Sequence, residues 1–431
     1  ADEVRLSAAQ ADIAEAQFDI ARATLLPQLR INSSYSRTFE SARSNAVSAV
    51  FNQPNTYSVN ANVSQTLFQG GRLVATARAA SALAEASRLN AEERKALYTV
   101  ELQRAYLGAL LAERLAELQQ TNLQLASARL TQVQQFHTAG RAAQYDVLRA
   151  KVERANIEPL TIQAQNDRDL FHLELKRLLN LPVDQPLALT TQVDPQAAQS
   201  IVASFEDSVV VPQRPALRAA ELTARSRRLA LSAARSEFMP TITAFFQTGF
   251  QAFPPPGFGF PATRGSLNAD SCPAGSVAGR VCQNGGWFED RNMGIQFSWP
   301  LFDGLRAKSA LELARAQTRI AELELRLERE QVAVEVARAR AELQRARAIF
   351  DARRETSAEA NEAFRLASLR FSRGLSTQLE VSDAQLALLT AEGSTARATY
   401  DLFLATAELA RALGRPIPMP LTSAAARRTD N

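Results

Sequence analysis

The sequence predicts a membrane protein of the α+β class, built as a tandem repeat in which β-hairpins alternate with very long helices. Three observations lead to this prediction. The chain repeats itself at an offset of 234 positions, several segments alternate polar and apolar residues over ten or more positions, and two long segments contain almost no Gly or Pro. Long alternation with aromatic residues near the ends is typical of a strand that crosses a membrane with its other face toward water.

The repeat is visible in residues of the same type that recur at one offset. It pairs Ser64 with Ser298, Leu67 with Leu301, Phe68 with Phe302, Gly70 with Gly304, Gly140 with Gly374, Gln144 with Gln378 and Pro182 with Pro416. Because no insertion or deletion is needed between these positions, the two halves are copies of one structural unit. Upstream the offset becomes 213, which pairs Pro27 with Pro240.

The repeat divides the chain into two units with a linker and a tail. We expect the first repeat at 1–182, with a helix, a β-hairpin at 27–68, a long helix at 72–139 and a helix at 142–180. A linker follows at 183–213, which the family resemblance given below places in an equatorial belt. The second repeat, 214–416, carries a helix, a hairpin at 240–302, a long helix at 305–373 and a helix at 375–413, before a tail at 417–431.

The strands are predicted from a period of two residues. In the first hairpin the apolar positions are Leu29, Ile31, Tyr35 and Phe39, then Tyr57, Val59, Ala61, Val63 and Leu67. In the second hairpin they are Ile242, Ala244 and Phe246, then Met293, Ile295, Phe297, Trp299 and Leu301. Each hairpin would therefore present one apolar and one polar face.

The long helices are predicted from the absence of helix breakers. Neither Gly nor Pro occurs from Leu305 to Arg373, and only Gly108 interrupts the stretch from Arg72 to Ala139. At ~1.5 Å per residue each helix would be roughly 100 Å long. Turns at Gly140 and Gly374 would then reverse the chain into antiparallel helical hairpins. No apolar run reaches the ~18 residues of a membrane-spanning helix.

Four strands cannot close a barrel, since known membrane barrels begin at about eight strands. A barrel built from these hairpins must therefore be shared among copies of the chain. Two copies would supply eight strands and three would supply twelve, and the sequence pattern leaves this number open.

Composition and motifs argue against other classes of function. The 49 Lys and Arg residues are balanced by 45 Asp and Glu residues and interleaved with them, unlike the clustered charge of a nucleic-acid-binding surface. The sequence gives no basis for an enzyme or a cofactor. It has only two histidines, no nucleophile with a neighbouring base, no phosphate-binding glycine loop and no metal-ligand spacing.

The two cysteines, Cys272 and Cys282, lie in one turn-rich segment of the second repeat. We expect a disulfide in an oxidising compartment, with two unlinked thiols as the alternative. A zinc site is disfavoured because His137 and His172 are far away in the sequence.

Several phrases, taken in their order and at their common offset, resemble the TolC family of outer-membrane efflux proteins. They are "RPALRAAEL" at 214–222, "LLPQL" and "MPTIT" before the hairpins, "SQTLFQGGR" and "SWPLFDGLR" after them, "AGRAAQYDV" and "RGLSTQLEV" at the turns, and "LLNLP" and "ALGRP" at the ends. The resemblance implies a homotrimer whose shared 12-stranded β-barrel in the outer membrane continues into a 12-helix periplasmic α-barrel.

The resemblance also implies a function and partners. Such a protein is a passive exit duct of a tripartite efflux or type I secretion system. It is opened at its periplasmic tip by an adaptor (a membrane fusion protein) and an inner-membrane transporter of the RND, ABC or MFS type. The alternative is a periplasmic coiled-coil adaptor or scaffold, which would stay native without detergent.

In the family, acidic residues after the second tip narrow the periplasmic end. Glu380 and Asp383 stand at the matching positions, and Asp146 aligns with Glu380. Carboxylates converging from several chains would favour cations, whereas acids in a first helical turn are also ordinary complements of the helix dipole. The chain departs from the family at Phe371, where a tyrosine is familiar, and at Ser376, where an arginine is. We therefore consider Arg149 as a substitute gate partner.

Two further groups of residues complete the predicted sites. Gly140 and Arg141 at the first tip, and Gly374 and Leu375 at the second, are expected to dock the adaptor. Phe68, Gly70, Trp299, Phe302 and Gly304 mark the junctions between strand and helix, where the aromatic rings either form an interfacial girdle or pack on the helices. We expect Asp303 to cap the helix that follows, and Pro159 and Gly393 to mark helix bends or ends.

Overall fold

The computed structural model describes residues 2–40, 55–190, 214–252 and 287–418. The chain forms two compact units. The helical unit comprises Ala1–Ala11, Ala86–Glu221 and Glu324–Asn431, and the sheet unit comprises Asp12–Glu85 and Leu222–Leu323. Both units draw on both sequence repeats. Each compact unit is therefore formed by packing of one repeat against the other, because the long helices of a single repeat cannot bury their own apolar faces.

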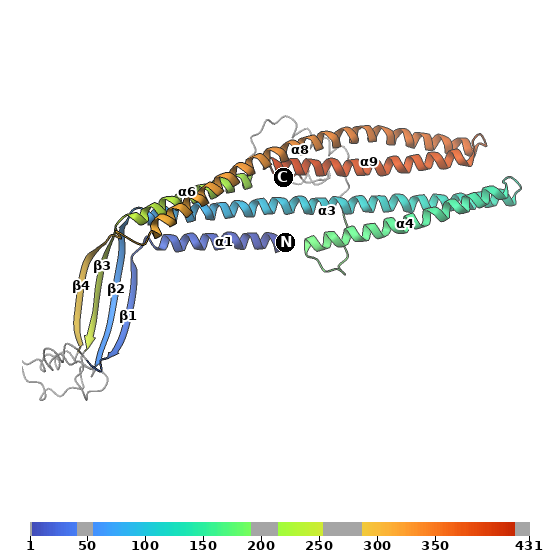
Figure 1. Ribbon diagram of the computed structural model, residues 1–431. Coiled ribbons are helices and arrows are strands. Elements are labelled where there is room, and N and C mark those ends of the chain that lie inside the picture. Colours follow the sequence, from blue (N-terminus) through green and yellow to red (C-terminus); the bar gives the residue numbers. More distant parts are fainter. Residues whose placement is uncertain (1, 41–54, 191–213, 253–286, 419–431) are drawn as a thin grey trace, which may run out of the picture. The chain divides into compact units, whose positions relative to one another are not determined.

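The sheet unit contains one four-stranded antiparallel sheet (Figure 1). Its strands are β1 (Gln28–Arg37), β2 (Asn55–Gln69), β3 (Thr241–Ala252) and β4 (Trp287–Ser298), in the order β1-β2-β3-β4. Pairing of β2 with β3 joins the two predicted hairpins. The first and last strands are shorter than expected, since Phe39 and Leu301 lie beyond their ends.

The two faces of the sheet differ in polarity, as the alternation predicts. Ile31 lies opposite Ala61, and the neighbouring Tyr35 and Tyr57 rings lie 4.8 Å apart. On the same face β4 exposes Met293, Ile295 and Phe297. The other face carries amides and small polar groups, namely Asn32, Ser34, Asn60, Asn62, Gln247, Asn292 and Gln296. One face thus suits lipid and the other suits water.

The two hairpins have the same register, residue for residue. Gln28 pairs with Ser64 in the first hairpin, and Thr241 pairs with Ser298 in the second. These two pairs are related by the sequence offsets of 213 and 234. The repeat found in the sequence is therefore also a repeat of structure.

The sheet unit also contains the larger parts of α1 (Asp2–Ala23) and α6 (Pro215–Arg235) and the short 3-10 turn η2 (Ser236–Phe238). The first residues of α3 (Arg72–Thr138) and α8 (Arg306–Ser372) belong to it as well. Gly70 has φ +56°, and a Cβ there would lie 2.7 Å from the Cβ of Met239. Glycine is therefore required between β2 and α3. The predicted cap is confirmed, since the Asp303 carboxylate accepts a hydrogen bond from the Ala307 N–H at 2.9 Å.

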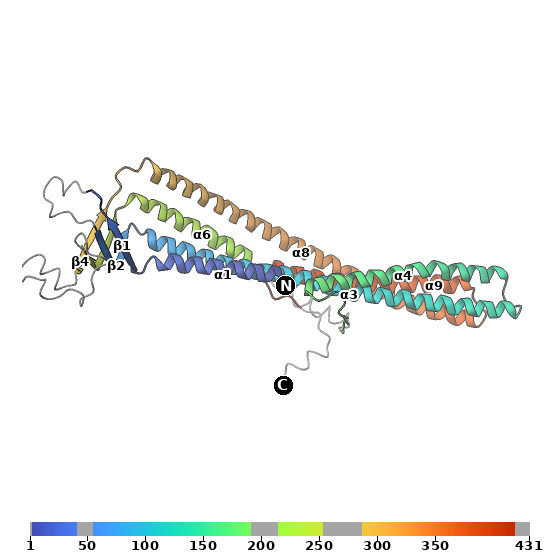
Figure 2. The same ribbon diagram turned by 90° about the horizontal axis from the view of Figure 1, so that it is seen from below.

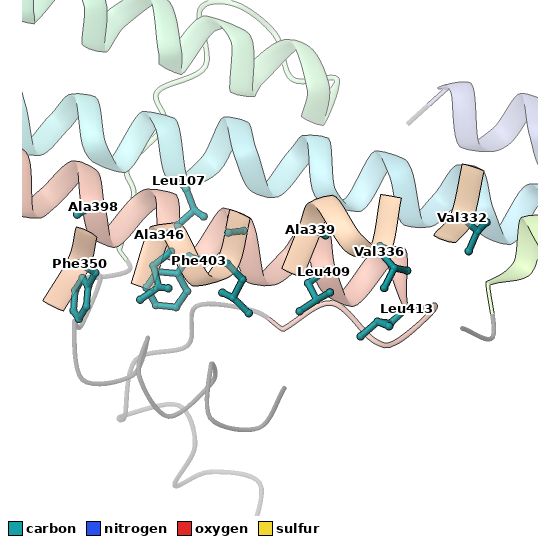
Figure 3. Packing of buried hydrophobic residues seen from close by; sticks show 14 residues of the cluster. Leu107, Val332, Val336, Ala339, Ala346, Phe350, Ala398, Phe403, Leu409 and Leu413 are labelled. Carbon is teal, nitrogen blue, oxygen red and sulfur yellow. The ribbon is translucent and has the colours of Figure 1, made fainter. Parts of the chain in front are cut away.

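The helical unit contains two antiparallel hairpins, α3 with α4 (Gln144–Leu179) and α8 with α9 (Gln378–Ala412) (Figures 1 and 2). Its largest hydrophobic cluster joins the two repeats. Figure 3 shows Leu107 of α3 among side chains of α8 and α9, including Phe350 and Phe403. The first repeat thus supplies part of the core of the second.

Two expected helix breakers do not end their helices. Pro159 lies inside α4, and Gly393 lies inside α9, which continues to Ala412. Of the two expected alternatives, a helix end was wrong at both positions, and a bend stays a prediction. At Pro159 the one backbone hydrogen bond that proline cannot donate is a small part of a long, packed helix. Gly393 instead faces α3, where an added Cβ would lie 3.5 Å from a Leu115 methyl group.

Some predictions fall outside the described residues. These are the disulfide of Cys272 and Cys282, the linker 183–213 from residue 191 onward, and the tail 417–431 from residue 419 onward. Within the described part of the chain, no helix has both the length and the hydropathy needed to cross a membrane.

Candidate functional site

The two helical hairpins turn in the same way. Gly140 has φ +71° and Gly374 has φ +73°, the left-handed conformation that glycine adopts without strain. Gly140 donates its N–H to the His137 carbonyl, and the Arg141 N–H bonds the Phe136 carbonyl. The second tip repeats both bonds, from Gly374 to Phe371 and from Leu375 to Arg370. Both tips are Schellman motifs, and their surfaces are exposed around the glycines.

The acids that follow the tips make local contacts at helix starts. The Asp146 carboxylate accepts a hydrogen bond from the Ala143 N–H at 3.1 Å. The Thr377 hydroxyl accepts one from the Glu380 N–H at 3.4 Å, and the Glu380 carboxylate lies 3.8 Å from the Arg370 guanidinium. Within one chain these carboxylates therefore complement helix N-termini.

The other predicted gate residues are not brought together within one chain. Asp383 is exposed and Arg149 is partly buried, and among the described residues neither forms an ion pair. Phe371 is partly buried and contributes its carbonyl to the second tip. Convergence of Glu380 and Asp383 from several copies is a property of an assembly and stays a prediction.

A buried polar cluster close to the tips links the two repeats; we call it the Arg129 cluster. Its members are Arg129 and Asn122 of α3, Glu153 of α4, and Ser382 and Gln385 of α9. Arg129 donates to the Ser382 hydroxyl at 2.6 Å, to the Gln385 side-chain oxygen at 3.0 Å and to the Glu153 carboxylate at 3.3 Å. One cation thus ties three helices together.

The central cation of the Arg129 cluster is largely buried, and its hydrogen-bonding partners surround it. The Arg129 side chain is 11% exposed, and this burial lowers its pKa, an effect that the Glu153 carboxylate opposes. Gln385 in turn donates to Asn122 at 2.7 Å. Removing Arg129 would leave buried acceptors without a donor, which costs more free energy than an exposed ion pair contributes.

A second buried ion cluster lies in the helical unit, where α6 begins. Arg214 contacts the carboxylates of Glu93 and Glu335, and Arg411 contacts the same two acids at 3.5 and 3.3 Å. Burial alone would lower the pKa of Arg214, but its two acidic partners raise it above the ordinary value. We call these four residues the Arg214 cluster. Arg214, the first residue of the segment "RPALRAAEL", therefore has a structural role in this cluster.

The strand-to-helix junctions are described by their hydrogen bonds and exposure. The Trp299 indole donates to the Phe238 carbonyl at 3.2 Å. Phe68 and Phe302 are exposed, and Gly304 has φ +68°. The indole bond fixes one ring at the end of the sheet, while an interfacial girdle stays a prediction.

A known family matches almost the whole of this arrangement. Residues 2–181 and 210–415 match the family described as Outer membrane efflux protein. The chain belongs to the outer membrane efflux protein family. The efflux protein is 25% identical over 417 residues to the pyoverdine export outer membrane protein OpmQ of Pseudomonas putida. This match covers 95% of the present chain and 82% of OpmQ.

Solved structures share the fold of this efflux protein. The outer membrane protein VceC of Vibrio cholerae matches with a TM-score of 0.72 and 19% identity, over 97% of this chain and 94% of VceC. The open state of the Neisseria gonorrhoeae MtrE outer membrane channel matches with a TM-score of 0.67 and 21% identity, over 97% and 88% of the two chains. The protein is thus an outer-membrane exit duct for efflux that extends into the periplasm.

The buried Arg129 cluster of the efflux protein does not include the gate residues predicted from the sequence. Ser382 lies between the predicted gate residues Glu380 and Asp383, but on the face of α9 that meets α3. One signal for Arg129 was present in the sequence. From Leu118 to Phe136 Arg129 is the only charged residue, in a chain whose helices are otherwise rich in charge.

Proposed function

We propose that three copies of this efflux protein share one β-barrel and one helical barrel, which together form a passive duct. A periplasmic adaptor and an inner-membrane transporter would open it and supply the energy. The observation that supports this proposal is the four-stranded sheet, in which the outer edges of β1 and β4 have no partner strand among the described residues.

The unpaired sheet edges and the exposed apolar face of the sheet both favour pairing between copies of the chain. In a bilayer each unpaired N–H or C=O of an edge strand costs several kcal/mol, on the order of the desolvation of a peptide group. The sheet also exposes Met293 at 82% and Ile295 at 71%. Pairing β4 of one copy with β1 of the next would satisfy both edges and turn the apolar face toward lipid.

The Arg129 cluster is a suitable fastening for a closed tip. It joins α3 and α4 to α9 in the first turns after the second tip, so it would hold the two hairpins of one chain together. Exposed Glu380 and Asp383 would then be free to face the axis and favour cations there. Gly140, Arg141, Gly374 and Leu375 would form the surface that the adaptor contacts.

Electrical recording in planar lipid bilayers tests this function. The detergent-purified protein should insert and give discrete, small, cation-selective single-channel currents, as expected for a duct with a closed acidic tip. Protein that stays monodisperse and native without detergent, and gives no currents, would contradict the duct and favour a periplasmic scaffold. The matched control is the same preparation after thermal unfolding.

A further inference from the structure

The two repeats of the helical unit are equivalent down to single hydrogen bonds. Thr161 of α4 donates to the Gln119 carbonyl of α3 at 3.3 Å, and Thr395 of α9 donates to the Arg353 carbonyl of α8 at 3.0 Å. These pairs are related by the 234-residue offset. The 234-residue offset therefore assigns each position in one helical hairpin an equivalent position in the other.

Within one chain the two hairpins meet where α3 packs against α9. Arg104 of α3 forms an ion pair with Glu408 of α9, and the Leu115 methyl group packs at Gly393. The 234-residue offset converts Arg104 into Arg338 and Leu115 into Ile349, both on α8. The same offset, taken backward, converts Glu408 into Glu174 and Gly393 into Pro159, both on α4. The counterpart contact would thus join α8 to α4.

The structure leaves this counterpart contact unmade within one chain. Arg338 forms no ion pair among the described residues, and Ile349 is exposed. Every residue of α4 and α9 is described, and α4 buries four residues where α9 buries thirteen. Since the two helices are equivalent by repeat, α4 is missing the cover that α3 gives to α9.

A hollow on α4 marks the same place. Pro159 lies in this hollow, together with Ala155, Gln163 and Asp167. Their counterparts Leu389, Gly393, Arg397 and Asp401 line a hollow on α9. Leu115 of α3 forms one wall of that hollow, and Ile349 and Arg353 of α8 form another. On α4 the hollow is lined by α4 residues alone.

We infer that α8 of one copy covers α4 of the next, with Arg338 against Glu174 of the partner copy and Ile349 in the hollow at its Pro159. The inference deepens the proposed function, because it rests on several copies sharing one assembly. Glu174 already accepts hydrogen bonds from Arg177 of its own chain at 2.7 and 2.9 Å, so Arg338 would be a second cation at this exposed carboxylate. Such a contact uses different surfaces on its two sides and therefore closes a ring when the rotation permits. Arg114, which pairs with Glu392, has no such counterpart, since Ala348 takes its place.

Cysteine cross-linking in the full chain tests the register. In a background with Cys272→Ser and Cys282→Ser, Ile349→Cys with Pro159→Cys should form covalent dimers and trimers on oxidation. Leu115→Cys with Gly393→Cys has the same geometry within one chain, so it should oxidise without an increase in mass. Ile349→Cys with Val152→Cys, two turns away on α4, exposed and outside the hollow, should cross-link several-fold less.

Two failures remain distinguishable. A background protein that runs as a monomer in detergent before oxidation contradicts the shared assembly itself. An assembled protein in which the Ile349 and Pro159 pair stays at monomer mass overturns the proposed register alone. Charge exchange gives an independent readout: Arg338→Glu should weaken assembly several-fold, and adding Glu174→Arg should restore it. Arg104→Glu, the counterpart within one chain, should leave assembly unchanged, and equal loss in both variants would overturn the inference.

Discussion

Arg129 of α3 donates a hydrogen bond to the hydroxyl of Ser382 on α9, over 2.6 Å and across 253 positions of sequence. The same guanidinium contacts Glu153 and Gln385. The two repeats of one chain are therefore tied together by a buried cation close to their tips. The counterparts of Arg129 and Ser382 in the other repeat are Ala363 and Leu148, so this fastening occurs once in each chain.

Arg129→Ala should raise the single-channel conductance in planar bilayers, because the two hairpins of each chain lose their common hydrogen-bond donor near the tip. The matched control is Arg168→Ala, which removes the same charge from an exposed pair with Asp169 on α4. That control should keep the parental conductance. Equal conductance in both variants would show that the Arg129 cluster does not restrict the tip, and Arg149→Ala would then be the next variant to record.

Gly374→Trp should abolish export by cells while assembled protein remains in the outer membrane, since the side chain would project from an open tip onto the proposed adaptor surface. A Cβ at Gly374 meets no atom within 4 Å, so no clash inside the chain is expected. Gly304→Trp is the matched control, because Gly304 has φ +68° and equally open surroundings away from the tips. Loss of assembled protein only in Gly374→Trp would assign this glycine a structural role instead.

Arg411→Met should destabilise the helical unit by about 2 kcal/mol, the scale of a hydrogen bond to a charged group, because the Glu93 and Glu335 carboxylates are then left with one cation, Arg214, between them. Its repeat counterpart, Arg177, pairs with Glu101 and Glu174 on an exposed surface. Arg177→Met should therefore cost less than ~1 kcal/mol. Urea unfolding in detergent, followed by circular dichroism, compares them. Equal midpoints would mean that burial of the cluster adds nothing to stability.

The strand register between copies is a further prediction of the repeat. Ala61 of β2 lies opposite Thr248 of β3, and the two offsets convert this pair into Ile295 of β4 and Tyr35 of β1. Ile295→Cys with Tyr35→Cys, in the cysteine-free background, should thus cross-link neighbouring copies. Ile295→Cys with Ser33→Cys, displaced by two residues on the same face, should react less. A higher cross-linking yield for the displaced pair would show that β4 and β1 of neighbouring copies do not pair in the register of β2 and β3 within one chain.

Much of this fold follows from local sequence chemistry. The tip glycines Gly140 and Gly374 and the breaker-free stretches predicted helices at 72–139 and 305–373, and the structure has them at Arg72–Thr138 and Arg306–Ser372. Period-two alternation predicted the polar and apolar faces of the sheet. These features depend on neighbouring residues, so a single chain's sequence carries them directly.

The buried contacts between repeats could not be read in this way. Successive residues of a helix point about 100° apart, because a turn contains about 3.6 residues. Ser382 therefore lies on the face of α9 that meets α3, whereas its neighbour Asp383 lies on an exposed face. Which face meets a partner is decided by packing between segments hundreds of residues apart, such as Leu115 with Gly393. The one sequence feature that indicated this packing was the lack of other charged residues around Arg129, from Leu118 to Phe136.

Native mass spectrometry of the detergent-purified protein measures the number of chains in the assembly, which the open sheet edges and the uncovered face of α4 both predict to be more than one. We predict a complex of three chains, each of 47.1 kDa. A folded species with the mass of one chain, stable after detergent removal, would contradict it.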